Sequence, residues 1–204
     1  MLTTRNMKLY LPFERNANDF SGNGNNGTVS GATLVDGGKF GKCYSFDGVD
    51  DRIVLDGVLP CGAGSTIALW MTFDEMTSGI HYILGTTASG IRYNATDNTL
   101  LYYQYPAESA NYTTISFIPS ATWHHVAAVR TTARNVNWYI DGVYIGSSDP
   151  GATGTLGVNN IGRRITPPYY YYYKGKIDSI LYYDKSLNAN DIKRIYMGLH
   201  PLNG

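Results

Sequence analysis

The chain consists almost throughout of short apolar or alternating runs that Gly, Asn, Asp and Pro interrupt. Such runs suit β-strands, whereas a helix needs a longer periodic segment. Because turn signals recur about every ten residues, the pattern predicts an all-β fold, a sandwich of two antiparallel sheets. The predicted strands are Lys8–Phe13, Thr28–Val35, Cys43–Phe46, Arg52–Leu55, Thr66–Phe73, Tyr82–Thr86, Gly90–Tyr93, Leu100–Tyr105, Thr113–Ile118, His124–Arg130, Val136–Ile140, Val143–Ser147, Leu156–Ile161 and Ile177–Tyr183.

The clearest local signal is Asp141-Gly142 between two alternating runs. An Asp-Gly pair in this position favours a tight type I′ hairpin, in which Ile140 faces Val143. The predicted core face of this hairpin carries Val136, Trp138, Ile140, Val143 and Ile145. The opposite face carries Asn137, Tyr139 and Tyr144, so it mixes polar and aromatic groups.

One helix is predicted, near the C-terminus. Asn188 is a suitable N-cap, and Asp191 follows it at the spacing of a capping box. The apolar stripe of this helix consists of Ile192, Ile195, Tyr196 and Leu199. Gly198 and Pro201 mark its end.

Charge and hydropathy exclude two classes of partner. The chain has 16 Lys and Arg against 16 Asp and Glu, whereas nucleic-acid binding needs a basic excess. No apolar window approaches the ~18 residues of a membrane span, and the N-terminus lacks the apolar run of a signal peptide. The 204 residues suit a single domain over 1–204, with a short arm at 1–7 and a tail at 198–204.

The two cysteines, Cys43 and Cys61, are too few for a disulfide framework. Cys43 falls in a predicted strand and Cys61 in a Gly-rich loop. The simpler interpretation is two unpaired thiols, one of them buried as a small hydrophobic group. A disulfide between them is the alternative.

Tyrosine is in excess, with 18 residues, and Tyr169–Tyr173 are consecutive. Because successive residues of a strand point to opposite faces, at least two of these rings face away from the core. The run is either a Tyr-rich edge strand that leans on its neighbours or a platform of rings for a sugar or a partner. Tyr suits both roles, since it has an apolar ring and a polar tip.

Several blocks resemble, in order, the laminin G-like domains of the concanavalin A-like lectin/glucanase superfamily. They are Leu11–Gly27, Phe40–Ile53, Thr66–Trp70, Trp123–Ala127, Trp138–Gly142, Gly175–Asp178 and the closing segment Leu187–Tyr196. The resemblance implies a concanavalin A-like jelly roll with one concave sheet. In this family the His124-His125 pair belongs to a structural strand, and we expect both histidines to be structural. Trp70 and Trp123 are expected to be core residues.

The resemblance also implies one calcium ion, held between the opening loop and the acid of a Gly-x-Ile-Asp motif. Asp19, Asn23 and Asp178 match those positions, and their oxygens are of the kind that calcium prefers. The alternative is that the Asp178 carboxylate accepts backbone N–H groups of the opening loop. A second acidic segment, Asp47–Asp51, lacks the spacing of an EF-hand loop, and a tight turn is the better interpretation.

Catalysis is not expected. Glycosidases use two carboxyl groups that flank the scissile bond, and active relatives carry them at alternate positions of a strand. This chain has three glutamates, Glu14, Glu75 and Glu108, and none lies two residues from another acid.

Two functions fit these observations. The first is a non-catalytic module that binds a glycan or cell-surface polysaccharide, or serves adhesion. Its candidate contacts are Tyr103, Tyr105, Tyr139, Tyr144, Tyr169, Tyr170, Tyr171, Tyr172 and Tyr173. The second is a structural protein of a virus particle that contacts capsid or tail proteins or itself. It would explain an extracellular type of domain without an export signal. The expected location is therefore extracellular or on a virion surface.

Overall fold

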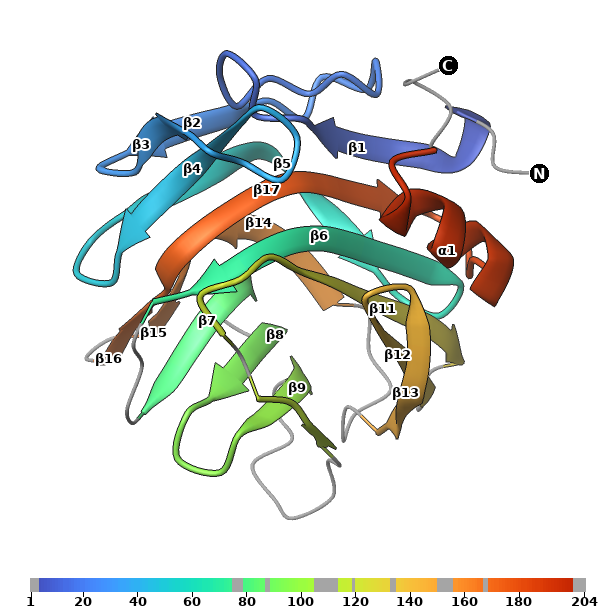
Figure 1. Cartoon of the computed structure of the whole chain (residues 1–204). Helices are drawn as coiled ribbons and strands as arrows, with labels where there is room; N and C mark the ends of the chain where they lie inside the picture. Colours follow the sequence, from blue (N-terminus) through green and yellow to red (C-terminus); the bar gives the residue numbers. More distant parts are fainter. Residues whose placement is uncertain are drawn as a thin grey trace.

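The computed structural model describes residues 4–74, 79–86, 89–104, 114–118, 120–132, 135–149, 156–166 and 169–199. Within these ranges two antiparallel sheets, of eight and seven strands, form a sandwich (Figure 1). A single α-helix, α1 (Ala189–Tyr196), is found in the described part of the chain. The predicted all-β sandwich with one short C-terminal helix is confirmed. No described helix has the length and apolar character that a membrane span requires.

The eight-stranded sheet places the C-terminal strand in its middle. Its order is β13 (Val143–Ser148), β12 (Asn135–Ile140), β11 (His124–Thr132), β6 (Ser65–Phe73), β17 (Lys174–Tyr183), β4 (Lys42–Asp47) and β3 (Thr33–Asp36). Strand β1 (Met7–Leu11), which follows a 3-10 turn at Thr4–Asn6, pairs with the second half of β17, beyond the end of the β4 pairing. Strand β17 therefore holds β6 on one edge and both β4 and β1 on the other.

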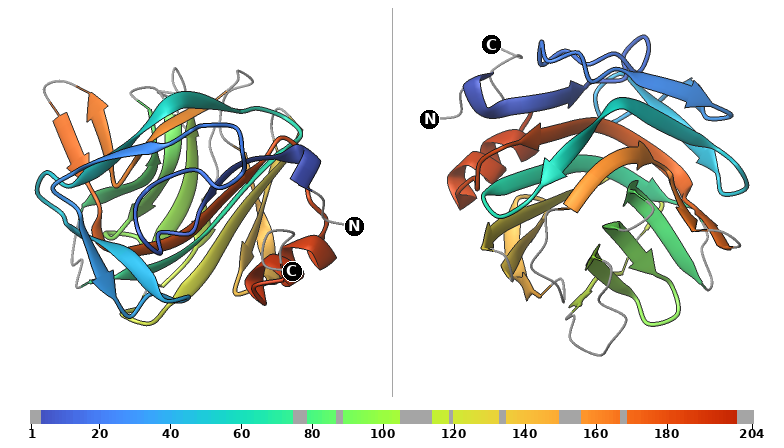
Figure 2. Two further views of the ribbon diagram at one scale, coloured as in Figure 1. Left: turned by 90° about the horizontal axis from the view of Figure 1, so that it is seen from above. Right: turned by 180° about the vertical axis from the view of Figure 1, so that it is seen from behind.

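The seven-stranded sheet forms the second layer. Its order is β10 (Ile115–Ser116), β9 (Thr99–Gln104), β8 (Ser89–Asn94), β7 (Ile80–Gly85), β14 (Leu156–Ile161), β5 (Arg52–Cys61) and β2 (Gly27–Ser30). A separate hairpin of β15 (Arg163–Thr166) and β16 (Tyr169–Tyr172) lies beside β7 at the edge of the sandwich (Figures 1 and 2).

The centre of the eight-stranded sheet is buried on both faces. All residues of β6 are buried, because one face of the strand meets the seven-stranded sheet and the other meets α1. Leu69 and Met71 belong to the core between the sheets, whereas Ala68 belongs to a smaller core with Ile192 and Ile195 of α1. Burial of each isoleucine contributes roughly 1.5–3 kcal/mol.

Helix α1 begins and ends as expected. The Asn188 side chain accepts a hydrogen bond from the backbone N–H of Asp191 at 3.0 Å, which satisfies one donor of the first turn. Gly198 adopts a φ of 75° after the last turn. The prediction that Leu199 lies in the buried stripe is wrong: Leu199 is 53% exposed, because the Gly198 turn redirects the chain.

The predicted Asp141-Gly142 hairpin is present. Ile140 pairs with Val143, and the two turn residues have φ values of 50° and 78°, as a type I′ turn requires. Trp138 is fully buried, which confirms it as a core residue.

The outer strand of this hairpin differs from the prediction. Val143 and Ile145 were expected to face the core, but they are 63% and 42% exposed. A bulge between Trp138 and Tyr139 places Gly146 opposite Trp138, and β13 is the last strand of its sheet. The main core therefore extends as far as β12, where Trp138 is buried, and does not continue under β13.

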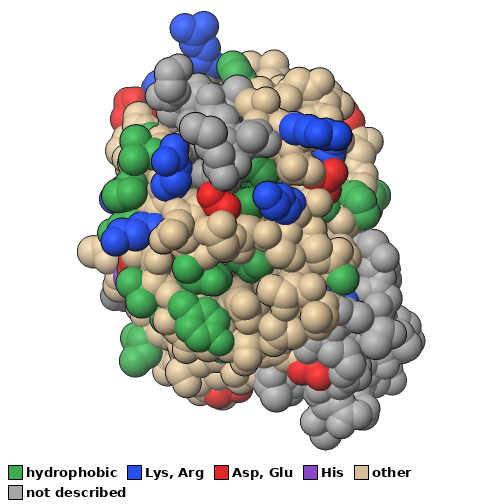
Figure 3. Space-filling model, turned by 90° about the vertical axis from the view of Figure 1, so that its right-hand side faces the viewer, with side chains coloured by type: hydrophobic (Ala, Val, Ile, Leu, Met, Phe, Trp, Pro, Cys, Tyr) green, Lys and Arg blue, Asp and Glu red, His purple; other side chains and the backbone are tan. Residues whose placement is uncertain are grey.

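Hydrophobic side chains on the face that carries α1 lie in separate patches among polar ones (Figure 3).

Two other expectations need correction. The predicted strand Thr28–Val35 is two strands, β2 in one sheet and β3 in the other, and Gly31 between them has a φ of 80°. The chain crosses between the layers at this glycine.

Cys61 is buried at the end of β5 rather than in a loop. Both cysteines are unpaired, and burial raises the pKa of Cys43 to about 11 and of Cys61 to about 12.

An aromatic stack fixes α1 to the outer face of the eight-stranded sheet. Tyr196 of α1 stacks on Trp70 of β6, with ring centroids 5.4 Å apart, and His125 of β11 lies 5.3 Å from Trp70. Trp70 is buried in this outer layer. Trp123, in contrast, is half-exposed and donates to the Gly37 carbonyl at 3.3 Å, so its prediction as a core residue is wrong.

The two histidines point to opposite faces, as predicted. His124 bonds to Asp141 at 3.0 Å and packs against Phe117 of the main core, whereas His125 lies under α1. His125 is fully buried, and no described residue hydrogen-bonds either of its ring nitrogens. Burial lowers the pKa of His125 from 6.5 to about 4, although the Asp141 charge opposes this shift.

A glycine holds the β15–β16 hairpin on the sandwich. Gly162, between β14 and β15, has a φ of 82°. Its N–H donates to Ile83 of β7, and its carbonyl accepts from Tyr173, which follows β16. A Cβ atom at position 162 would lie 2.5 Å from the Phe46 ring, and Phe46 is itself buried. Only glycine fits this junction without displacing core atoms.

We expect Gly162→Ala to lower the free energy of unfolding more than Gly64→Ala does. Gly64 has a similar φ of 81° and open space around its Cβ position, so its variant loses only the roughly 1–2 kcal/mol of the backbone conformation. Gly162→Ala adds an overpacking cost of about 1–3 kcal/mol. Urea unfolding of both variants measures the difference, and equal losses would contradict the steric argument.

We also expect acid to destabilise the protein through His125. The unfolded chain binds a proton at His125 near pH 6.5, whereas the folded state resists it down to about pH 4. The unfolded state therefore gains stability as the pH falls through this window. His125→Leu removes this term, so its free energy of unfolding should fall less than that of the wild type between pH 7 and 4.5. Parallel pH profiles would show that His125 does not contribute.

Candidate functional site

The tyrosines predicted to contact a ligand do not lie on one surface. Tyr139 and Tyr144 belong to β12 and β13 of the eight-stranded sheet, with ring centroids 5.5 Å apart. Tyr139 is only 6% exposed, whereas Tyr144 is 50% exposed. Tyr103 lies on β9 of the seven-stranded sheet, opposite Gly90, and Tyr105 lies outside the described residues. A single site cannot include all of them.

The first four residues of the tyrosine run form strand β16, and the fifth, Tyr173, directly precedes β17. Tyr169, Tyr170, Tyr171 and Tyr172 pair with Thr166, Ile165, Arg164 and Arg163 of β15. Tyr173 is different: it is fully buried, packs against Phe46 and Phe73, and donates a hydrogen bond to the Thr72 carbonyl. Tyr173 is thus a core residue, and its prediction as a ligand contact is wrong.

The hairpin packs on β7 through Tyr82. Tyr82 is fully buried and belongs to neither hydrophobic core. The Tyr171 ring lies 5.6 Å from the Tyr82 ring, and the Arg164 guanidinium donates to the Tyr82 hydroxyl at 2.8 Å. Arg92 of β8 pairs with Tyr82 across the strands. Burial raises the pKa of Tyr82, while the charges of Arg92 and Arg164 oppose this shift.

Two further contacts fix the far side of the hairpin. A His81 ring nitrogen lies 3.2 Å from the Tyr172 carbonyl. Arg163 donates from Nε to the Asn160 side chain at 2.9 Å. We define the Tyr–Arg surface as Tyr82, Arg92, Arg163, Arg164, Tyr171 and Tyr172. Tyr82 lies beneath this surface, and Tyr171, Tyr172 and the three arginines are half-buried. Arg164 and Tyr171 contact Tyr82, whereas Arg163 and Tyr172, which alternate with them along the hairpin, point to its other face.

Sequence reasoning missed the arginines and Tyr82. Arg163-Arg164 directly follows a predicted strand and precedes the tyrosine run, which is the signal of a hairpin with a basic strand. The contact of this hairpin with Tyr82 joins residues 82 apart in the chain. Local patterns do not report such a contact.

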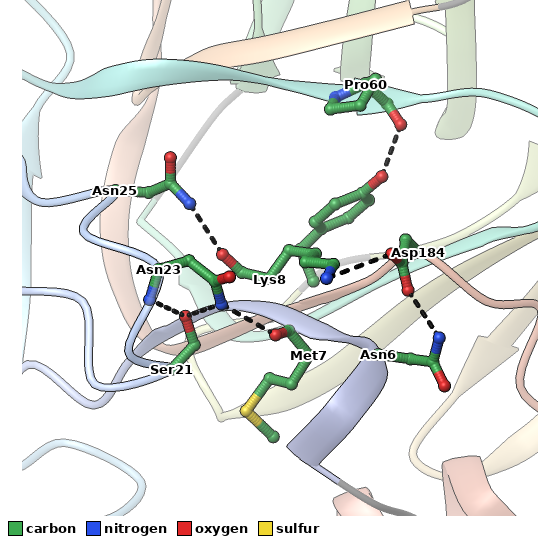
Figure 4. A network of polar contacts seen from close by, with 9 residues as sticks. Asn6, Met7, Lys8, Ser21, Asn23, Asn25, Pro60 and Asp184 are labelled. Carbon is green, nitrogen blue, oxygen red and sulfur yellow. Dashed lines mark hydrogen bonds and ion pairs between the residues drawn. The ribbon is translucent and has the colours of Figure 1, made fainter.

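The three predicted calcium ligands bond to different parts of the chain. The Asp19 carboxylate accepts from the N–H groups of Tyr10, Ser21 and Asn25 and from the Ser21 hydroxyl, at 2.8–3.0 Å. The Asn23 amide donates to the Met7 carbonyl and the Ser21 hydroxyl (Figure 4). These bonds fasten the opening loop to β1, and calcium would have to displace several of them at Asp19.

Asp178 lies on β17 and is fully buried. It accepts from the N–H of Phe40 at 2.9 Å and from the Ser179 hydroxyl at 3.2 Å, so its backbone donor is not in the opening loop. Burial raises the pKa of Asp178 to about 7. No contact between Asp178 and Asp19 or Asn23 is found in the described part of the chain, and calcium at these three residues stays a prediction.

The acidic turn at residues 47–51 brings its carboxylates together. Oxygens of Asp47, Asp50 and Asp51 lie within 4.8 Å of one another. The turn explains part of this arrangement, because Asp51 accepts from the Asp47 N–H at 2.8 Å and Asp47 accepts from Val49 at 2.8 Å. Such bonds stabilise a tight turn, which was the preferred interpretation.

One of the three glutamates, Glu14, lies in the described part of the chain. Glu14 lies beside Lys42, accepting from its N–H at 3.4 Å. Glu75 and Glu108 lie outside the described residues. The expectation that the chain is not an enzyme stays a prediction.

Comparison with known proteins defines the class. Residues 46–193 match the family model of the concanavalin A-like lectin/glucanases superfamily. The match spans most of the chain, so the chain belongs to this superfamily. The family resemblance predicted from the sequence blocks is confirmed. No curated protein matches the chain by sequence.

Solved structures share the fold at low identity. Domain 4 of AbnA, an extracellular arabinanase of Geobacillus stearothermophilus in complex with arabinotriose, has a TM-score of 0.74 and 20% identity, over 93% of this chain and 98% of that domain. A mutant of Trypanosoma rangeli sialidase has a TM-score of 0.72 and 16% identity, over 97% of this chain and 33% of the sialidase. The botulinum neurotoxin serotype D binding domain has a TM-score of 0.71 and 14% identity, over 96% of this chain and 52% of that domain. The chain thus corresponds to about a third of the sialidase and half of the toxin domain.

Proposed function

We propose that the chain is a non-catalytic carbohydrate-binding module and that the Tyr–Arg surface is its binding site. The observation that carries this proposal is the arrangement of Tyr171 and Arg164 around the buried Tyr82. It presents an aromatic ring and charged donors side by side on a hairpin at the edge of the sandwich. We expect the protein to encounter this sugar outside the cell or on the surface of a particle.

The chemistry of the surface suits a sugar. The C–H groups of a pyranose or furanose ring pack on a tyrosine ring, while its hydroxyls need hydrogen-bond donors and acceptors. Arg163, Arg164 and Asn160 supply donors of this kind. The mixture matches a ligand that is apolar on one side and polar at its rim.

The surface is also preorganised. The Gly162 N–H donates to Ile83 of β7, and the Tyr173 N–H closes the hairpin by donating to the Gly162 carbonyl. The Tyr173 ring is buried in the main core, and its hydroxyl donates to the Thr72 carbonyl. Residues that are already ordered lose little further entropy on binding. A preordered surface of this type therefore needs fewer contacts for a given affinity.

The comparisons support a carbohydrate ligand. The arabinanase domain is similar to this chain over nearly the whole length of both and was solved with arabinotriose. A protein partner is the other mode among the similar structures, since a botulinum neurotoxin DC binding domain was solved with rat synaptotagmin II. The rings on this surface favour the sugar.

We expect Tyr171→Ala to weaken sugar binding at least about tenfold, because loss of one ring contact costs roughly 0.5–1.5 kcal/mol beyond the lost burial. Tyr144→Ala is the matched control, since Tyr144 is exposed but lies on the other sheet. An oligosaccharide array that includes arabinotriose identifies ligands, and calorimetry compares the variants. Thermal melting checks that both remain folded.

Two results would contradict the proposal. Binding that Tyr144→Ala abolishes and Tyr171→Ala leaves intact would move the site to the eight-stranded sheet. An oligomer without affinity for any sugar on the array would instead favour a structural component of a virus particle, with protein contacts as its main role.

A further inference from the structure

Arg163 of the Tyr–Arg surface lies close to Arg52 of β5, whose positive charge lowers the pKa of Arg163. Ile53 of β5 pairs with Ile161 of β14. Arg52 precedes the first of these residues and Arg163 follows the second by two positions, so the two arginines lie at the same end of this strand pair. Ile53 faces the main core, and Arg52 therefore points to the outer face of the seven-stranded sheet. Both arginines are half-buried.

Neither arginine has an acidic partner among the described residues. Arg52 donates to the Asp50 backbone carbonyl at 3.1 Å, and Arg163 donates to the Asn160 amide oxygen at 2.9 Å. The ion pairs of the described chain involve Lys8, Lys42 and His124 instead. The nearest acids in the sequence, Asp50 and Asp51, converge with Asp47.

The pair is electrostatically unfavourable as it stands. Burial lowers the pKa of Arg163, and the positive charge of Arg52 lowers it further. Like charges that are partly removed from water repel each other more strongly than they do in bulk solvent. An anion placed between the two guanidinium groups would convert this repulsion into attraction.

We propose that Arg52 and Arg163 bind the carboxylate of an acidic sugar, whose ring then rests on Tyr172, the tyrosine that shares the hairpin face of Arg163. A guanidinium group presents parallel N–H donors that match the two oxygens of a carboxylate. Tyr172 lies opposite Arg163 on the hairpin and hydrogen-bonds it, and Asn160 fixes its Nε, so the donors are already oriented. This inference rests on the proposed carbohydrate function and names its ligand class.

Specificity for an acidic sugar follows from the positive charge near Arg163 and not from the net charge of the whole chain. The chain as a whole has a net charge of zero, so a general attraction to polyanions is not expected. Arg52 and Arg163 nevertheless lie close enough together for the positive charge of Arg52 to lower the pKa of Arg163. A discrete carboxylate on a sugar ring fits this local concentration.

Trigalacturonate and its fully methyl-esterified form are the test ligands, since they differ only at the carboxyl groups, which the ester carries uncharged and methylated. We expect calorimetry on the whole chain to show that the acid binds at least about tenfold more tightly, the effect of one charge-assisted hydrogen bond. Sialyllactose against lactose forms a second arm, which distinguishes a sialic acid from a uronic acid as the source of the carboxylate.

Substitution of the pair locates the effect. Arg163→Gln should weaken binding of the acid much more than binding of the methyl ester, and so remove most of the preference for the acid. Arg163→Lys keeps the positive charge but lacks the parallel N–H donors of a guanidinium group, and should retain part of the preference for the acid. Arg194→Gln, at an exposed position of α1, is the matched control and should behave as the wild type.

The outcomes separate this inference from the proposed function. Equal binding of acid and ester, with both lost in Tyr171→Ala, would overturn the carboxylate site and leave the carbohydrate function standing. A preference for the acid that persists in Arg163→Gln would also overturn it. Absence of binding to every acidic and neutral sugar would contradict the proposed function itself.

Discussion

The insertion of strand β17 into the middle of the eight-stranded sheet is the constraint on which the rest of the structure depends. One edge of β17 pairs with β6, and the other pairs first with β4 and then with β1. The C-terminal strand thus joins the beginning of the chain to its centre. Tyr173 directly precedes β17 and is buried between Phe46 and Phe73. The core therefore determines where the tyrosine hairpin emerges.

Local patterns were enough to predict most of the architecture. The Asp141-Gly142 turn, the buried Trp138 and the Asn188 cap follow from short-range chemistry, and each is present. The errors arose where a single residue changes a register or a direction. The crossover at Gly31 divided one predicted strand between two sheets, and a bulge beside Trp138 exposed Ile145. Neither event has a reliable signature in the sequence.

The candidate site was less predictable, for a physical reason. The tyrosine run was recognised, but alternation alone does not say which ring enters the core, and Tyr173 does. The rings acquire their setting from Tyr82 and the arginines, which belong to other strands. Contacts between distant segments depend on the final packing of the sandwich. The predicted tyrosines therefore separated into two groups on opposite sheets.

The central claim is that the hairpin side of the seven-stranded sheet binds a carbohydrate. The most direct measurement is an NMR titration of the isotope-labelled chain with trigalacturonate, followed through backbone amides. We predict concentration-dependent shifts that concentrate at residues 80–85, 160–166 and 169–173 and leave β12 and β13 unchanged. Shifts confined to β12, β13 and α1, or no shifts with any sugar that the array identifies as a ligand, would contradict the account.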